Sequence, residues 1–280
     1  RTRTVAEGDL NRRTARTTFS STPGEFGDKS PTILLPGTFI SASQTFQEQI
    51  PVIERLGDKP VLADYSNSSF SEAMLRAQLL DFMDSVLVGG KKVNLMGASL
   101  GATSILDLLL EEPEARDRVG KIVLMGALYS SHDFKPSGLN NGLRKAKQMG
   151  LVREPFVRAV MPLARSRIKV EHDPELALHK EAIHESRRNV SNRALSERLY
   201  SIFKRGSIEV RERIEIPALF IFWQKDESIA PRQGVMTNVV TDPSMSIVSG
   251  NHGWTLRSSP EINPQLELFF KTENEELLAA

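Results

Sequence analysis

The 280-residue sequence predicts an α/β protein, with a mostly parallel, doubly wound sheet, helices on both faces and an inserted helical cap. The first observation is that short apolar runs of strand length alternate along most of the chain with longer segments of helical periodicity. The second is that this alternation stops between about residues 130 and 213, where the pattern is helical and rich in charge, and then resumes. Repeated strand–helix units form parallel sheets that helices cover on both faces.

Each predicted strand is a short run bounded by residues that favour turns. The run 31–35 is apolar and stops at Pro36-Gly37, whereas 16–20 is more polar and suits the edge of a sheet. The run 217–223 is strongly apolar, as expected of a strand buried on both faces. The predicted strands are 16–20, 31–35, 60–65, 93–96, 121–126, 217–223 and 245–248.

The predicted helices have apolar residues three or four positions apart, as Phe46, Ile50 and Ile53 illustrate. Ser71 stands where a side chain could cap the start of a helix. The predicted helices are 46–56, 71–87, 103–112 and 264–271. Residues 1–30 are expected to form a polar leader and edge strands, 31–129 and 214–280 the α/β core, and 130–213 a helical cap.

Composition excludes several kinds of site. The chain has no cysteine, which rules out disulfides, thiolate–zinc sites and a cysteine nucleophile. A net charge of +1 argues against a nucleic-acid partner. His179 and His184 are five residues apart rather than the four that place two ligands on one helix face, so we predict no metal site and no cofactor. The first residues lack the apolar stretch of a signal peptide, and no run is long enough to span a bilayer, so we expect a soluble protein of the cytoplasm or of an organelle stroma or matrix.

Ser99 carries the most informative motif. It is the serine of Gly97-Ala98-Ser99-Leu100-Gly101, a G-x-S-x-G sequence between a predicted strand and a predicted helix. Side chains at the two glycines would collide with the neighbouring strand and helix, and the sharp turn lifts the serine hydroxyl clear of the sheet. The arrangement is typical of a serine nucleophile.

A serine hydroxyl is a weak nucleophile that needs a general base, and the base needs an orienting acid. His252 follows the predicted strand 245–248 and precedes the last helix, so we predict it as the base. Two carboxylates, Asp226 and Glu227, follow the strand 217–223 and are both candidates for the acid. The predicted triad is therefore Ser99, one of these carboxylates, and His252.

These residues give the chain a resemblance to α/β-hydrolase fold enzymes of the esterase and lipase type, from about Pro31 to the end of the last helix. The nucleophile, acid and histidine follow one another in that family's order, and the insertion resembles its variable cap. The spacing to Ile229 and Pro231 favours Glu227 as the acid, whereas residue type favours Asp226. We prefer Asp226 and keep Glu227 as the alternative.

The resemblance also implies an oxyanion hole of backbone N–H groups. The family commonly has His-Gly at the end of its first core strand, and this chain has Pro36-Gly37 there. By position the donors would be Thr38, with Phe39 as second choice, and Leu100. A backbone donor does not depend on the missing histidine.

The expected activity is cleavage of a carboxylic ester through an acyl-enzyme intermediate. The same residues could act on a thioester or a carbon–carbon bond or transfer an acyl group, and a non-catalytic ligand receptor could keep the same fold. Apolar residues in the insertion predict an apolar acyl group: Leu143, Met149, Leu151, Phe156, Val160, Met161, Leu163 and Phe203. The insertion is also basic, with 16 Lys and Arg against 7 Asp and Glu from Lys135 to Arg205, which we interpret as solvated helix faces.

Overall fold

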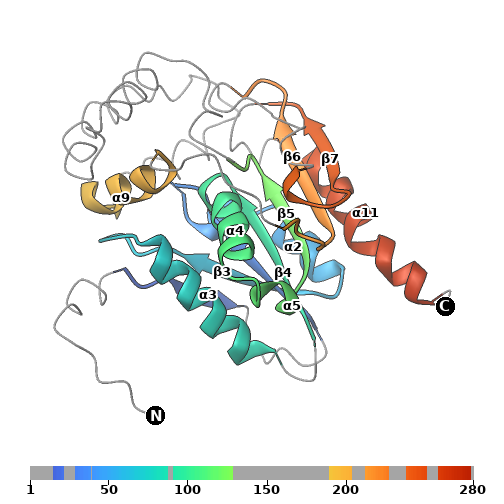
Figure 1. The fold of residues 1–280 in the computed structure, drawn as a ribbon. Helices are drawn as coiled ribbons and strands as arrows, with labels where there is room; N and C mark the ends of the chain where they lie inside the picture. The colour runs from blue at the N-terminus through green and yellow to red at the C-terminus, as the bar shows by residue number, and fades with distance from the viewer. Residues whose placement is uncertain are drawn as a thin grey trace, which may run out of the picture.

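In the computed structural model, seven strands form one sheet through the middle of the protein (Figure 1). The structure describes residues 15–21, 29–38, 40–87, 91–128, 189–203, 212–226, 238–250 and 258–278. The strands are β1 (Thr18–Ser21), β2 (Pro31–Leu35), β3 (Lys59–Asp64), β4 (Val93–Ala98), β5 (Val119–Met125), β6 (Ala218–Trp223) and β7 (Ser244–Val248). Their order is β1-β3-β2-β4-β5-β6-β7. Only β1 is antiparallel to its neighbour, which confirms a mostly parallel sheet.

The carboxyl ends of the parallel strands lie at one edge of the sheet, and the register of the strands determines which residues are neighbours at that edge. Leu35 of β2 lies beside Gly97 of β4, and Ala98 lies beside Met125 of β5. On the far side of β5, β6 pairs with β7 up to Trp223 and Val248. Loops that follow β2, β4, β5, β6 and β7 therefore converge at the carboxyl edge, where doubly wound sheets bind their ligands.

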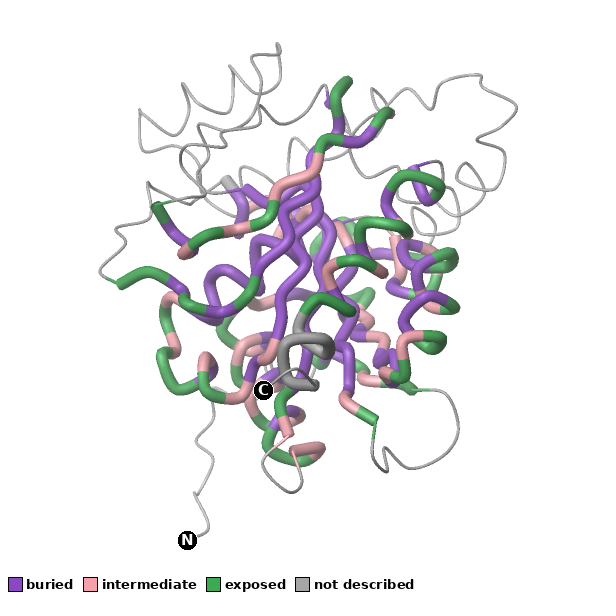
Figure 2. Tube along the Cα trace, turned by 90° about the vertical axis from the view of Figure 1, so that its right-hand side faces the viewer, coloured by how far each residue is buried: buried purple, intermediate pink, exposed green. Residues whose placement is uncertain are grey.

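Helices cover both faces of the sheet. They are α1 (Ala42–Thr45), α2 (Ile50–Arg55), α3 (Glu72–Val86), α4 (Leu100–Glu111), α5 (Ala115–Arg118), α9 (Asn192–Phe203) and α11 (Ser259–Leu278). Buried residues of α3, α4 and α5 pack on one face, and those of α1, α2 and α11 pack on the other. Figure 2 shows the buried strands between helices whose outer sides are exposed. The doubly wound fold class is thus confirmed.

The predicted helix 46–56 is too long, because only 50–55 is helical, as α2, and Phe46 ends the separate helix α1. Pro51 explains the break. It lies in the first turn of α2, where its missing N–H costs no hydrogen bond. A continuous helix over 46–56 would put the proline ring against the carbonyl of the preceding turn.

The last helix is longer than predicted, since α11 begins at Ser259 and not at Pro264. Pro264 lies in the second turn and removes one intrahelical hydrogen bond, which the apolar contacts of Ile262, Leu266 and Phe270 with the sheet offset. Of the predicted cap, 130–213, the described ranges include only 189–203 and 212–213, and the first of these contains α9. The division into core and cap therefore stays a prediction.

A buried polar cluster joins the amino ends of β2 and β4. The Asp58 carboxylate accepts hydrogen bonds from the Thr32 hydroxyl and the Asn94 amide, both at 2.7 Å. The side-chain amide oxygen of Asn94 in turn accepts from the backbone N–H of Lys121 at 3.0 Å, and the Lys121 ammonium donates to two backbone carbonyls of α11. Burial raises the pKa of the Asp58 carboxyl, while these hydrogen bonds and the charge of Lys121 oppose the rise.

Candidate active site

Ser99 connects β4 to α4 in a strained conformation. Its φ is 51° and its ψ is −112°, values that a residue with a side chain rarely adopts. The flanking glycines make the turn possible. A Cβ at Gly97 would lie 2.5 Å from the Ala102 nitrogen, and a Cβ at Gly101 would overlap the carbonyl oxygen of Leu35. The sharp turn predicted from the G-x-S-x-G motif is therefore present in the structure.

Hydrogen bonds on both sides of Ser99 hold this turn in place. The Ser99 N–H donates to the Met125 carbonyl of β5 at 2.7 Å. The Ser99 carbonyl accepts from the backbone N–H and the hydroxyl of Thr103, at 3.0 and 2.9 Å. The next residue, Leu100, begins α4, so its N–H has no acceptor within the helix and lies at the positive end of the helix dipole.

The loop after β2 passes directly beside Ser99. A Cβ built on Gly37 would lie 3.6 Å from the Ser99 Cβ and 3.7 Å from the Ala98 carbonyl oxygen, which is van der Waals contact. Thr38, the predicted oxyanion donor, is 5% exposed. The structure thus brings the loop of Thr38 next to the candidate nucleophile, while Phe39, the second choice of donor, lies outside the described residues.

Two buried side chains hold this loop. The Tyr65 hydroxyl donates to the Pro36 carbonyl at 3.0 Å, and Arg198 donates through Nη1 to the Thr38 carbonyl at 2.8 Å. Arg198 also donates through Nη2 to the carbonyls of Ser66, at 2.9 Å, and Tyr65, at 3.4 Å. Its guanidinium carbon lies 5.3 Å from the centroid of the Tyr65 ring.

Tyr65 is neutral and Arg198 is charged, and these are the protonation states in which the two side chains donate the hydrogen bonds to the loop. Burial raises the pKa of the Tyr65 phenol, so the hydroxyl keeps its proton and donates. Burial lowers the pKa of Arg198 to about 10, which leaves the guanidinium charged at neutral pH. The loop therefore rests against a buried cation and a neutral phenol.

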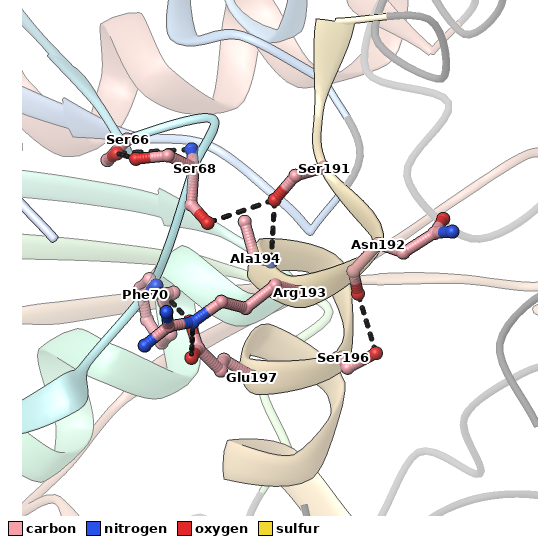
Figure 3. Close-up of polar contacts among 9 residues, drawn as sticks. All are labelled: Ser66, Ser68, Phe70, Ser191, Asn192, Arg193, Ala194, Ser196 and Glu197. Atoms are coloured by element: carbon pink, nitrogen blue, oxygen red, sulfur yellow. Dashed lines mark hydrogen bonds and ion pairs between the residues drawn. The ribbon is translucent and has the colours of Figure 1, made fainter. Parts of the chain in front are cut away.

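Helix α9, which carries Arg198, is tied to the loop after β3 (Figure 3). The Ser191 hydroxyl donates to the Ser68 carbonyl at 2.9 Å and accepts from the Ala194 N–H at 3.0 Å. The Glu197 carboxylate accepts from the Phe70 N–H at 2.6 Å and from Arg193 at 2.8 Å. These contacts fix α9 beside the carboxyl edge of the sheet.

Asp226 lies in the turn after β6 and is 4% exposed. Its strand is two places from that of Ser99, and neighbouring strands are about 4.8 Å apart, so roughly 10 Å separates the two strands. An acid at that distance needs a bridging imidazole to act on the serine. Glu227 and His252 lie outside the described residues, so the choice of acid and the position of the base stay predictions.

The segment that leads to His252 is hydrogen-bonded to the turn of Asp226. The Gln224 N–H donates to the Val248 carbonyl at 2.9 Å, and the Lys225 N–H donates to the Gly250 carbonyl at 3.0 Å. The polypeptide thus passes beside the candidate acid two residues before the candidate base.

The same segment is also fixed where it meets α11. The Ser249 carbonyl accepts from the Ser258 hydroxyl at 2.7 Å, and the Trp223 indole N–H donates to the Ser258 hydroxyl oxygen at 3.1 Å. Glu261 accepts from the N–H and the hydroxyl of Ser249, which lowers the pKa of its carboxyl. Residues on either side of 251–257 are therefore bonded to each other.

A pocket of about 280 Å³ lies beside Pro36, and Ser41, Asp64, Tyr65 and Arg198 are among its mostly polar lining residues. Of the residues predicted to line an apolar acyl pocket, Phe203 is the last residue of α9, and the other seven lie outside the described residues. Within the described ranges, no group of three or more His, Asp or Glu side chains could hold a metal ion. Of the helices that the structure describes, none combines the length and the apolar character needed to cross a membrane.

Sequence reasoning missed Arg198 and Tyr65. A signal for Arg198 exists in α9, where Ala194, Leu195 and Ile202 are buried at helical spacing and Arg198 occupies the same face. A charged residue on the apolar side of a helix needs buried partners. Nothing in the sequence identifies those partners, because the three carbonyls that accept from Arg198 come from loops more than 130 residues away.

No family model matches the sequence, and the search of curated proteins gave no match. Solved structures do match. An enol-lactonase from Burkholderia xenovorans is 13% identical, with a TM-score of 0.66, over 91% of this chain and 96% of that one. The carboxylesterase CesB from Bacillus subtilis is 19% identical, with a TM-score of 0.61, over 92% and 88%. A meta-cleavage product hydrolase from Pseudomonas fluorescens is 16% identical, with a TM-score of 0.64, over 92% and 94%.

These structures share the arrangement of the sheet and helices over nine-tenths of the chain, although identity is low. The match agrees with the seven-stranded, mostly parallel sheet and the helices on its two faces. The protein therefore has the α/β-hydrolase fold.

Proposed function

We propose that the protein is a serine hydrolase that cleaves a carboxylic ester through an acyl-enzyme intermediate. Ser99 attacks the carbonyl carbon, and His252 takes the serine proton and returns it to the leaving alkoxide. Asp226, or Glu227 as the alternative, orients the imidazole. The N–H groups of Thr38 and Leu100 stabilise the oxyanion of the tetrahedral intermediate. Water then attacks the acyl-enzyme in the same way and releases the acid.

One observation carries the proposal: a strained serine lies beside the short loop after β2 that carries the Thr38 N–H. Positive φ at a residue with a side chain is costly and is found mainly where function needs it. A Cβ built on Gly37 would lie 3.6 Å from the Ser99 Cβ, and this closeness of the loop to the serine supports Thr38 as a donor to the oxyanion. A turn that served structure alone would need neither feature.

The test is covalent labelling of the purified protein with a fluorophosphonate, with the modified peptide identified by mass spectrometry. We expect stoichiometric labelling at Ser99, slowed by several orders of magnitude in His252→Ala because the serine loses its base. Ser99→Ala is the matched control and should not react. A folded wild-type protein that is not labelled would contradict the proposal and favour a non-catalytic receptor.

A panel of p-nitrophenyl esters then tests the acyl group. In a fitting apolar pocket each added methylene contributes up to about 0.8 kcal/mol, so kcat/KM should rise from acetyl to a medium chain. A flat profile, or a preference for acetyl, would contradict an apolar pocket. Thioester and carbon–carbon substrates of the same acyl length, and an added alcohol acceptor, distinguish esterase from thioesterase, carbon–carbon hydrolase and acyltransferase activity.

A further inference from the structure

The Thr38 N–H belongs to the peptide unit between Gly37 and Thr38. The peptide units on both sides of it are hydrogen-bonded to side chains. The Pro36 carbonyl, in the preceding unit, accepts from the Tyr65 hydroxyl, and the Thr38 carbonyl, in the following unit, accepts from Arg198. Because each peptide unit is planar, fixing the two outer units restricts the rotation of the unit between them. Without such bonds, Gly37 would give the loop more freedom than any other residue.

The presence of a buried arginine at position 198 indicates a role beyond stabilising the fold. Arg198 is 3% exposed, and among the described residues its hydrogen-bond acceptors are backbone carbonyls rather than a carboxylate. The nearby Asp64 favours the charged form through its field. A buried cation is a poor way to stabilise a fold, because apolar side chains of the same volume often do better. A positive charge one peptide unit from a developing oxyanion does have an electrostatic use.

Arg198 can act on the loop only if its own helix is fixed. The bonds of Ser191 to Ser68 and of Glu197 to Phe70 attach α9 to the loop after β3 (Figure 3). The second branch of the guanidinium donates to Ser66 in the same loop. Arg198 therefore joins two loops of the α/β core, one of which carries the Thr38 N–H.

We propose that Arg198 is a positioning residue of the oxyanion hole. By donating to the Thr38 carbonyl and the Ser66 carbonyl together, it holds the Thr38 N–H toward the oxyanion and adds a positive charge behind it. Tyr65 supports the other side of the same peptide unit. The inference rests on the proposed serine hydrolase function and extends it to a helix that the sequence assigns to the insertion.

The experiment compares Arg198→Met and Arg198→Lys with Arg116→Met, a matched change at an arginine of α5 that also donates to a backbone carbonyl, that of Leu109 at 2.7 Å, but lies at the amino edge of the sheet. For a p-nitrophenyl ester, we expect Arg198→Met to lower kcat about 10- to 100-fold with KM within threefold of wild type, because the oxyanion forms only after binding. Arg198→Lys keeps the charge but lacks the second branch, so it should recover part of the loss. Arg116→Met should stay within twofold of wild type.

A second readout reports on the oxyanion itself. An aryl trifluoromethyl ketone forms a tetrahedral adduct with the serine, and its Ki should rise in each variant by the same factor as kcat/KM falls. A structural role alone would lower the amount of folded enzyme and leave the Ki unchanged. Circular dichroism and thermal unfolding establish the folded fraction of each variant.

Tyr65→Phe keeps the test open if Arg198→Met does not fold, because it removes one hydroxyl and keeps the ring. We expect a fall in kcat of about fivefold with a parallel rise in the Ki of the ketone. A folded Arg198→Met with kcat within threefold of wild type, or with a higher KM at unchanged kcat, would overturn the inference while fluorophosphonate labelling of Ser99 still supports the hydrolase. If Arg198→Met does not fold, a folded Tyr65→Phe with unchanged kcat and Ki would overturn it. Wild-type protein that is not labelled at Ser99 would overturn both.

Discussion

A charged side chain lies beside each end of strands β2 and β4: the half-buried Asp58 at the amino end and the buried Arg198 at the carboxyl end. At the amino end, Asp58 accepts hydrogen bonds from Thr32 and Asn94, which lie 26 and 36 residues away in the sequence. At the carboxyl end, Arg198 donates to Thr38, 160 residues away. The backbone is strained at the carboxyl end, next to that loop, where Ser99 has a positive φ.

The comparison separates stability from function within one pair of strands. The amino end satisfies the hydrogen bonds of neighbouring segments and exposes no reactive group, so changes there should alter stability and leave activity unchanged. The carboxyl end holds a strained serine against a loop that distant residues fix. Changes at that end should alter activity, and relief of the strain should raise stability.

The largest effect is expected for Ser99. Ser99→Ala and Ser99→Gly should both lower ester hydrolysis by several orders of magnitude, leaving the rate that binding and the oxyanion hole provide. Glycine tolerates the backbone conformation of Ser99 and alanine does not, so Ser99→Gly should be more stable than Ser99→Ala by about 1 kcal/mol. Steady-state kinetics and urea unfolding measure the two effects. Equal stabilities would show that the carboxyl end is not strained.

The acid should come next. Asp226→Asn is expected to lower kcat about 10²- to 10⁴-fold, because a neutral partner leaves the imidazole in the wrong tautomer. Glu227→Gln is the matched change at the neighbouring carboxylate and should stay within a few-fold of wild type. Both variants should unfold close to the wild-type midpoint. A reversed ranking of the two would assign the acid to Glu227.

Gly101→Ala tests the packing behind the serine. The new methyl group would overlap the Leu35 carbonyl oxygen, so we expect a loss of about 2–3 kcal/mol in the free energy of unfolding, with lower activity because α4 must shift. Gly57→Ala is the control, since a Cβ there meets nothing within 4 Å and the cost comes from its φ of 90° alone. That variant should lose about 1 kcal/mol and keep full activity. Full activity in Gly101→Ala would contradict the tight packing.

Asp58→Asn tests the amino end and should have the smallest effect. Because burial raises the pKa of Asp58 above its ordinary value of 3.8, the folded state binds this proton more tightly than the unfolded state. The group therefore stabilises the fold fully below pH 3.8, and this contribution is lost as the pH rises through the raised pKa. Asp58→Asn has no carboxyl to bind this proton. The difference in free energy of unfolding, variant minus wild type, should therefore increase from pH 4 to pH 7.

Activity separates the two ends in this last variant. At pH 7 the kcat and KM of Asp58→Asn should equal those of wild type, because the carboxylate lies at the opposite edge of the sheet from Ser99. A fall in kcat would show that the amino end contributes to activity. A difference in stability that does not change with pH would contradict the raised pKa of Asp58.

Local patterns were enough to predict the strands, the fold class and the turn at Ser99. Each depends on neighbouring residues, such as the apolar run before Gly97 and the small residue at Gly101. The break between α1 and α2 was also a local event, and Pro51 was its visible cause. The error there came from giving apolar spacing more weight than the proline.

The support of the Thr38 loop could not be predicted in the same way. Arg198 resembles the other basic residues of its segment unless the apolar face of α9 is known, and its acceptors are carbonyls, which every residue possesses. Pairing a side chain with one particular carbonyl 160 residues away depends on how the whole chain packs. Sequence patterns describe neighbours along the chain, and this contact joins neighbours only in space.

The bond between Arg198 and Thr38 also has a consequence for the order of folding. Strands β2, β3, β4 and β5 leave the ribosome before α9, so a nascent chain can form the first half of the sheet while the Thr38 loop still lacks its cation. Contacts of such large sequence separation close late, since the chain must first lose the entropy of a long loop. During refolding from urea, ester hydrolysis should therefore return after the far-ultraviolet circular dichroism signal. The proposed activity therefore depends on a contact that forms late in folding.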